Sequence, residues 1–324
     1  MQTKVSFYQN SELDSNHLRT WVIGFILLLF SFYTLPGWLW KAAQTTLNVL
    51  GFSSNFLYSF AFDNESIASI SIFHLISHLS YTVPVLICIY LFQTKIRQKP
   101  FKDLVISSEG FRWSRIWIGF LLAGLILGLA QLLNMLFHYV DRPQEFLSSP
   151  GLLKQLGLKL TYDPIIFWTS LPFILFFIPI NAFMQEIIFR GFIDKGLYKI
   201  TGNIVIAFLI SAMLFAVWHL GNFDAEFGKP FYLLELFIFS IAMSIITLLD
   251  NGTEMAVGAH TANNLFFYIV VGLDIPYEPP SWLFSSGEPR HTLGTSFAEL
   301  AIWAIFIILF FGNLIKINIR NKAE

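Results

Sequence analysis

The chain has 324 residues, of which 55% are hydrophobic and 13% are charged, and its formal net charge is −1. Soluble domains carry roughly 25% charged residues, so this composition excludes an ordinary soluble domain and indicates a membrane protein. The near-zero net charge argues against a nucleic-acid-binding surface, and we expect no nucleic-acid partner.

The apolar residues fall in blocks long enough to cross a bilayer as helices, which takes about 20 residues. The blocks are continuous rather than alternating, which favours helices over the strands of a barrel. The sequence therefore predicts an all-α, polytopic membrane protein with about eight transmembrane helices. In chain order, the predicted blocks are Trp21–Trp40, Ile70–Phe92, Trp117–Val140, Ile165–Ile193, Ile204–Leu220, Phe231–Leu249, Met255–Leu273 and Ser296–Ile315.

The pattern of polar residues divides the chain into four regions. Residues 1–20 are expected to form an N-terminal cytoplasmic segment, and residues 21–164 a membrane region of three helices with longer loops. In residues 165–273 the polar residues become sparse and specific, as in a catalytic core. Residues 274–324 are expected to hold a loop, the last transmembrane helix and a cytoplasmic tail.

Lysine and arginine residues predict the orientation, because they accumulate in cytoplasmic segments. With the N-terminus placed inside, 14 of the 20 basic residues fall in inner segments, and six of these lie between residues 95 and 115. Both termini are therefore predicted to be cytoplasmic.

The stretch "QEIIFRG" (residues 185–191) lies inside the fourth apolar block. Ionisable residues in hydrocarbon are costly, so they are usually functional and paired. Glu186 and Arg190 are four residues apart and share one face of a helix. We expect Arg190 to keep the carboxylate of Glu186 charged, and Glu186 to belong to a functional site.

Two later stretches repeat the four-residue spacing. Phe215 and His219 lie in "FAVWH" on the fifth block, and His260 and Asn264 lie in "HTANN" on the seventh. Three predicted helices thus each present a polar residue with a partner or a packing residue one turn away.

Helix rise predicts that the polar residues of the three helices meet. Glu186 and His219 lie roughly 23–26 Å from the turn expected at Thr201-Gly202, which makes them roughly level on antiparallel helices. With residues 194–199 taken as a charged end that protrudes into the cytoplasm, this level is about 10 Å below the inner face. His260 lies about 9 Å into its own helix by the same rise.

Glu, His, His and Asn side chains in a dry pocket suit hydrolysis. A carboxylate activates water, an imidazole positions the water or carries its proton, and an amide or second imidazole donates to an oxyanion. The set Glu186, His219 and His260 is alternatively a zinc site with one position open for water. The sequence leaves both the metal-free and the zinc alternatives open.

At these residues the sequence resembles the type II CAAX prenyl endopeptidases and bacteriocin-processing enzymes, also called Abi or CPBP intramembrane proteases. The family has a Glu-Glu pair with Arg four residues after the second Glu, then a Phe with His four residues on, then a His with Asn or Asp four residues on. The three stretches match in this order between residues 165 and 273. The resemblance implies roles in catalysis for His219 and His260, an oxyanion amide in Asn264, and a structural partner for a carboxylate in Arg190.

One position departs from the family pattern. The first Glu of the pair, credited in the family with activating the water, is Gln185 in this chain. An amide cannot act as a general base. Either Glu186 takes over that role, or the chain is a natural pseudo-enzyme, or it is an inactivated variant.

The resemblance implies an intramembrane endopeptidase of a bacterial cell membrane that cuts a membrane-associated peptide or protein, of CAAX type or a bacteriocin leader. The alternative is a catalytically inactive family member that acts as a bacteriocin-immunity or regulatory membrane scaffold. Gln185 is the residue that favours the alternative.

Overall fold

The computed structural model describes residues 6–9, 17–51, 80–106, 110–140, 159–160, 164–220, 229–272, 284–285 and 293–323. These residues form an all-helical fold, as predicted, apart from three strands of two residues each. The α-helices are α1 (Ser6–Gln9), α2 (His17–Tyr33), α3 (Leu35–Val49), α6 (Trp113–Val140), α9 (Pro164–Glu186), α10 (Lys195–Thr201), α11 (Ile204–Trp218), α12 (Lys229–Asp250), α13 (Glu254–Leu265) and α14 (Leu293–Ala323). The π- and 3₁₀-helical segments are η2 (Phe92–Ile96), η3 (Phe101–Leu104), η4 (Ile187–Asp194) and η7 (Phe266–Val270).

Seven helices of the described residues are apolar enough to be considered as membrane spans. Three are also long enough, namely Trp113–Ala130, Leu171–Thr201 and Lys229–Asp250. Four are shorter, namely Leu18–Tyr33, Ser80–Ile96, Ile204–Trp218 and Ser296–Gly312. These helices support an integral membrane protein, while the number of eight spans stays a prediction.

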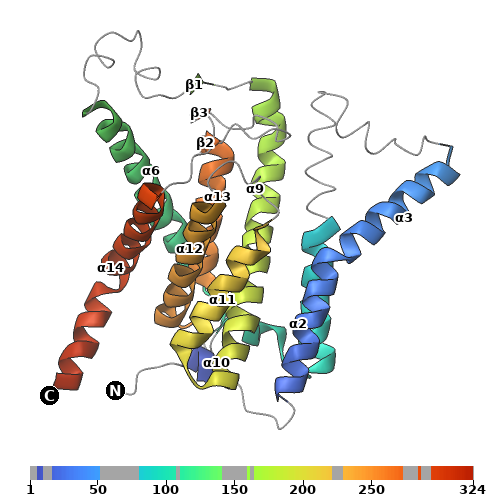
Figure 1. Cartoon of the computed structure of the whole chain (residues 1–324), viewed down its shortest axis with the longest axis horizontal. Helices are drawn as coiled ribbons and strands as arrows, with labels where there is room; N and C mark the ends of the chain where they lie inside the picture. Colours follow the sequence, from blue (N-terminus) through green and yellow to red (C-terminus); the bar gives the residue numbers. More distant parts are fainter. Residues whose placement is uncertain are drawn as a thin grey trace.

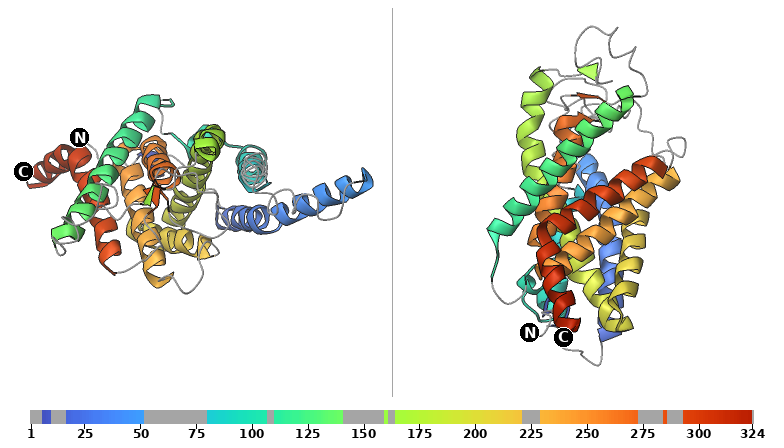
Figure 2. Two further views of the ribbon diagram at one scale, coloured as in Figure 1. Left: turned by 90° about the horizontal axis from the view of Figure 1, so that it is seen from above. Right: turned by 90° about the vertical axis from the view of Figure 1, so that its left-hand side faces the viewer.

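Helix α13 is the central helix of the bundle. It packs most extensively on α6 and also contacts α9 and α12. Helices α14 and α6 lie on one side of the bundle, and α2 and α3 lie on the other (Figures 1 and 2). With 12 residues, α13 is about 18 Å long, too short to span a bilayer alone. The predicted seventh block thus begins with the buried helix α13 and continues directly into η7, and its crossing of the membrane stays a prediction.

Helix α9 continues through η4 into α10 and reverses at the predicted turn. Gly202 adopts the left-handed conformation (φ 66°), which ends α10. Asn203 then caps α11, because its side-chain oxygen accepts hydrogen bonds from the amides of Val205 and Ile206. The turn at Thr201-Gly202 is thus confirmed, and α11 packs antiparallel against η4 and α10.

Two glycines allow α6 and α13 to approach closely. A Cβ atom on Gly258 of α13 would collide with the carbonyl oxygen of Ile116, and one on Gly119 of α6 would collide with that of Met255. Small residues are typical of such helix contacts in membranes. Since His260 lies two residues after Gly258, this contact also sets the depth of His260.

An ion network fixes the connection between α12 and α13. The Arg112 guanidinium contacts both carboxylate oxygens of Glu254, at 3.1 and 2.8 Å, and Oδ2 of Asp250 at 3.0 Å. Arg115 adds a second ion pair with Asp250 at 3.3 Å. Asp250 and Glu254 are buried, so their charges need these partners.

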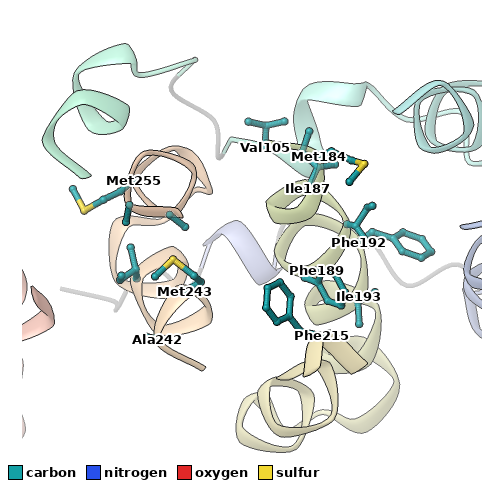
Figure 3. Close-up of a cluster of buried hydrophobic side chains, with 14 of the residues drawn as sticks. Val105, Met184, Ile187, Phe189, Phe192, Ile193, Phe215, Ala242, Met243 and Met255 are labelled. Atoms are coloured by element: carbon teal, nitrogen blue, oxygen red, sulfur yellow. The ribbon is translucent and has the colours of Figure 1, made fainter. Parts of the chain in front are cut away.

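The main hydrophobic core joins η4 to α11, α12 and α13. Figure 3 shows Phe215 of α11 pointing into this core beside Phe189 of η4, with Met243 of α12 nearby. The rings of Phe189 and Phe215 pack edge to face at 4.9 Å. This apolar layer surrounds the buried charges of the candidate site.

The three strands lie outside the helical core and form one small sheet. Strand β3 (Phe284–Ser285) pairs antiparallel with β1 (Lys159–Leu160) and parallel with β2 (Val271–Gly272). The sheet joins segments far apart in the sequence and holds none of the predicted site residues.

Candidate active site

Glu186 and Arg190 form a buried ion pair, as their spacing predicts. Glu186 is the last residue of α9, Arg190 lies in η4, and both side chains have 0% exposure. The Arg190 Nε atom lies 3.2 Å from Oε2 of Glu186. A second guanidinium nitrogen, Nη2, donates to the backbone oxygen of Ser240 on α12 at 3.0 Å. π-Helical segments such as η4 are frequent at functional sites.

His260 contacts the other oxygen of Glu186. Its Nδ1 lies 2.7 Å from Oε1, and the imidazole is 3% exposed. The ring packs edge to face on Phe239 at 4.8 Å, which restricts its rotation. Because an ionised carboxylate only accepts hydrogen bonds, Nδ1 carries the proton, and Nε2 remains an acceptor.

His219 follows the end of α11 and is half-buried. Its Nδ1 lies 2.7 Å from the backbone oxygen of Phe215. A carbonyl oxygen only accepts, so Nδ1 carries the proton and Nε2 of His219 is also an acceptor. The rings of His219 and His260 lie 4.5 and 6.2 Å from the ring of Phe215, which places the two imidazoles around one phenylalanine.

Asn264 lies one turn after His260 and is half-buried. Its side-chain oxygen accepts a long and weak hydrogen bond of 3.5 Å from the side-chain nitrogen Nδ2 of Asn263. In the described part of the chain, no hydrogen bond joins Asn264 to Glu186 or His219. Its role as an oxyanion donor stays a prediction.

Gln185, at the position that departs from the family pattern, is buried beside Glu186. Its Oε1 has no hydrogen-bond partner within the described ranges, and neither has Oδ1 of Asn181, one turn earlier on α9. Buried polar atoms are normally hydrogen-bonded, so these two amides need a partner such as water or a substrate group. Asn181 is a residue of this region that the sequence patterns did not single out.

The residues as placed do not fit a three-ligand zinc site. Among the described residues, no group of three His, Cys, Asp or Glu side chains is arranged to hold a metal ion. Glu186 uses one oxygen for His260 and the other for Arg190. The zinc alternative stays a prediction from the sequence.

Asp194 is a buried charge that sequence reasoning assigned wrongly. It was expected at a charged end that protrudes into the cytoplasm, but its exposure is 0%. Its Oδ2 accepts a hydrogen bond from Ser244 of α12 at 2.8 Å. The available signal was its spacing, because Asp194 follows Arg190 by four residues as Arg190 follows Glu186.

Comparisons with known proteins agree with the resemblance found in the sequence. The family model described as type II CAAX prenyl endopeptidase Rce1-like matches residues 167–266, which include all three motifs. A protein of Bacillus subtilis (strain 168), described as uncharacterized protein YyaK, is 27% identical over 177 residues. That alignment covers 54% of each chain, so the chain spans about half the length of this relative. No solved structure matches the chain.

Proposed function

We propose that this protein is an intramembrane endopeptidase. The match of residues 167–266 to the model of Rce1-like type II CAAX prenyl endopeptidases supports this proposal. The observation that carries the proposal is the buried hydrogen bond of 2.7 Å between His260 and Glu186, with Arg190 on the other carboxylate oxygen. This arrangement gives one imidazole a fixed orientation and a defined proton acceptor.

The geometry favours an imidazole as the general base. Oε1 of Glu186 contacts His260 and Oε2 lies in the ion pair with Arg190, so this carboxylate orients His260 and stabilises its protonated form, as an acidic residue does in hydrolytic triads. Nε2 of His260 then accepts a proton from water. His219, whose Nε2 is also an acceptor, positions the same water. With this division of roles, catalysis does not need a carboxylate at residue 185.

The reaction then proceeds through a tetrahedral intermediate. The water oxygen attacks the carbonyl carbon of the scissile peptide bond while His260 takes one water proton. The C–N bond breaks, and the imidazolium returns its proton to the departing amine. The amides of Asn264 and Gln185 are our candidates to donate hydrogen bonds to the oxyanion, since preorganised donors are worth about 10²–10³ in kcat.

The substrate class that fits is a membrane-associated peptide or protein with its scissile bond near the membrane surface. The test is cleavage of a prenylated CAAX-type peptide by the purified protein in proteoliposomes. We expect Glu186→Gln and His260→Ala to lower kcat at least about 100-fold, the range of general acid–base catalysis. Met213→Ala, on an exposed position of α11, is the matched control. Equal cleavage by all four proteins would show that another site is responsible.

Gln185 favours a second candidate function, a catalytically inactive membrane scaffold in bacteriocin immunity or regulation. The variant Gln185→Glu distinguishes the two candidates. If the wild type is inert and Gln185→Glu cleaves the peptide, the natural chain is a pseudo-enzyme. If the wild type cleaves and Gln185→Glu does not exceed it, the imidazole mechanism holds.

A further inference from the structure

Two amide side chains of α9 are buried without a hydrogen-bond partner. Asn181 and Gln185 are 9% and 7% exposed. Oδ1 of Asn181 and Oε1 of Gln185 accept no hydrogen bond from any residue that the structure describes. A buried acceptor without a donor lowers stability, so it calls for a donor from outside the fold, namely water or a ligand. Two such acceptors on consecutive turns of one helix indicate a single ligand that reaches both.

Both amides lie on the face of α9 that packs against α13, its neighbour in the bundle (Figure 1). Four residues of α9 recur at intervals of three or four and form one stripe along the helix, namely Ile174, Ile178, Asn181 and Gln185. Ile174 and Ile178 belong to one buried cluster with Leu265 of α13. The stripe therefore faces α13, and its last residue, Gln185, directly precedes Glu186 of the candidate active site.

The spacing of the two amides matches an extended peptide backbone. Side chains four residues apart on a helix lie about 5–6 Å from each other. In an extended strand, the N–H groups on one side recur at every second residue, about 6.6 Å apart. A side-chain amide also matches a peptide group chemically, because its oxygen accepts from N–H and its nitrogen donates to C=O. The two unpartnered oxygens therefore fit two N–H groups of one extended peptide.

We propose that Asn181 and Gln185 bind the backbone of the peptide substrate, which lies extended along α9; this inference rests on the proposed endopeptidase function. Gln185 holds the peptide group beside the scissile bond, and its nitrogen remains available for the oxyanion. Asn181, one turn and about 6 Å further along α9, holds a peptide group two residues away. Because both contacts are made to the main chain, they position peptides of different side-chain sequence.

The first test asks whether the two amides serve the fold. Gln93 is the matched control, because it is buried and paired at both ends: its Nε2 donates to the Pro100 carbonyl at 3.2 Å, and its Oε1 accepts from Arg97 at 2.9 Å. Gln93→Met is expected to lower Tm in detergent, since it removes both hydrogen bonds. Asn181→Leu and Gln185→Met are expected to keep or raise Tm. A loss as large as that of Gln93→Met would show that the two amides are paired within the fold and would overturn the proposal.

The second test measures binding without cleavage. The probe is a prenylated CAAX-type peptide whose scissile peptide bond is replaced by a methyleneamine group, so that it cannot be hydrolysed. We expect Asn181→Leu to raise its Kd about tenfold, the upper range for one lost hydrogen bond, and Gln93→Met to keep the wild-type Kd.

A series of the same peptide with single N-methylated peptide groups then locates the contact. At one position, N-methylation is expected to raise the Kd of the wild type but not that of Asn181→Leu, because the hydrogen bond is already absent in the variant. If every N-methylated peptide loses as much affinity for the variant as for the wild type, Asn181 does not contact the backbone and the proposal is wrong.

Binding and cleavage together separate this proposal from the proposed function. With a cleavable peptide, Asn181→Leu is expected to raise KM about tenfold and to keep kcat within about twofold. If the wild type binds the probe through Asn181 but cleaves nothing, the endopeptidase function fails and the binding site stands. If the wild type cleaves and Asn181→Leu keeps its KM and Kd, the binding site fails and the function stands. A wild type that binds no peptide overturns the binding site as well.

Discussion

The buried charges of Glu186 and Arg190 are compatible with a stable fold only because they form an ion pair. Removing one partner of a buried pair costs about 3–5 kcal/mol, because the other charge is left uncompensated. Arg190 also depends on the Ser240 carbonyl and on the faces of Phe189 and Phe215, 5.9 and 5.5 Å away. These contacts hold the guanidinium in place but do not neutralise Glu186.

We therefore predict that Arg190→Met destabilises the protein more than the double variant Glu186→Gln with Arg190→Met. The expected cost of the single change is about 3–5 kcal/mol. Thermal melts in detergent of the wild type, both single variants and the double variant measure it. Lys41→Met, on an exposed position of α3, is the control. Additive losses would mean that the two side chains do not interact.

The contacts of Glu186 with His260 and Arg190 also predict that peptidase activity does not depend on a bound metal ion. Glu186 contacts His260 through one oxygen and is paired with the charge of Arg190 through the other, so we expect peptidase activity to survive dialysis against a strong chelator. Metal analysis of the purified protein accompanies the assay. Activity that is lost with the metal and restored by zinc would contradict the metal-free mechanism.

At this scale the sequence predicted the pair Glu186–Arg190, because a four-residue spacing on one helix is a local property. It also predicted that His260 and Glu186 meet, from helix rise alone. It could not predict the burial of Asp194, because that depends on how η4 packs against α12, where Ser244 donates to the carboxylate. A charged residue near a helix end looks the same in the sequence whether it is solvated or buried.

At the scale of the helices, the contact between α6 and α13 sets the geometry of the site. Gly258 faces the backbone of Ile116, whereas Gly124 of α6 has open space at its Cβ position. The sequence showed these glycines but not which of them lie at a helix contact, because that depends on the rotation of each helix.

Gly258→Ala is predicted to push α13 away from α6 and to displace His260. Overpacking of this kind lowers the free energy of unfolding by about 1–3 kcal/mol. We expect the relative loss in the rate of peptide cleavage to exceed the relative loss in this free energy. Gly124→Ala is the matched control and is expected to behave as the wild type. Activity and Tm of the two variants are measured side by side. Equal activity in both would show that the close helix contact does not position His260.

For the whole molecule, apolar composition predicted the membrane and the helical class. The number of spans was harder to predict, because apolar residues in the block 255–273 are also explained by burial inside the protein rather than by contact with lipid. Its first part, α13, lies in the middle of the bundle, where protein surrounds it, whereas η7 holds no buried residue. Apolar residues alone do not separate these two environments. The boundaries of the four predicted regions stay predictions.

Orientation in the membrane is testable with introduced cysteines in a Cys88→Ser background, since Cys88 is the single cysteine of the chain. Lys41→Cys and Lys102→Cys both replace exposed residues. With both termini cytoplasmic, Lys41→Cys is expected to react with a membrane-impermeant maleimide on intact cells, and Lys102→Cys only after lysis. The reverse labelling pattern would invert the predicted topology.

Helix α11, which ends next to His219, has a consequence for the lipid around it. Its 15 residues are about 22 Å long, whereas the hydrocarbon layer is about 30 Å thick. Thinning of the bilayer is one way to accommodate so short a helix, and beside α11 it would bring the headgroup layer toward His219. A peptide anchored by its lipid would then reach the site without leaving its leaflet. We expect the protein to cleave the peptide faster in liposomes of short-chain lipids than in liposomes of long-chain lipids. Equal cleavage rates in the two would show that the length of α11 does not affect the access of substrate to the site.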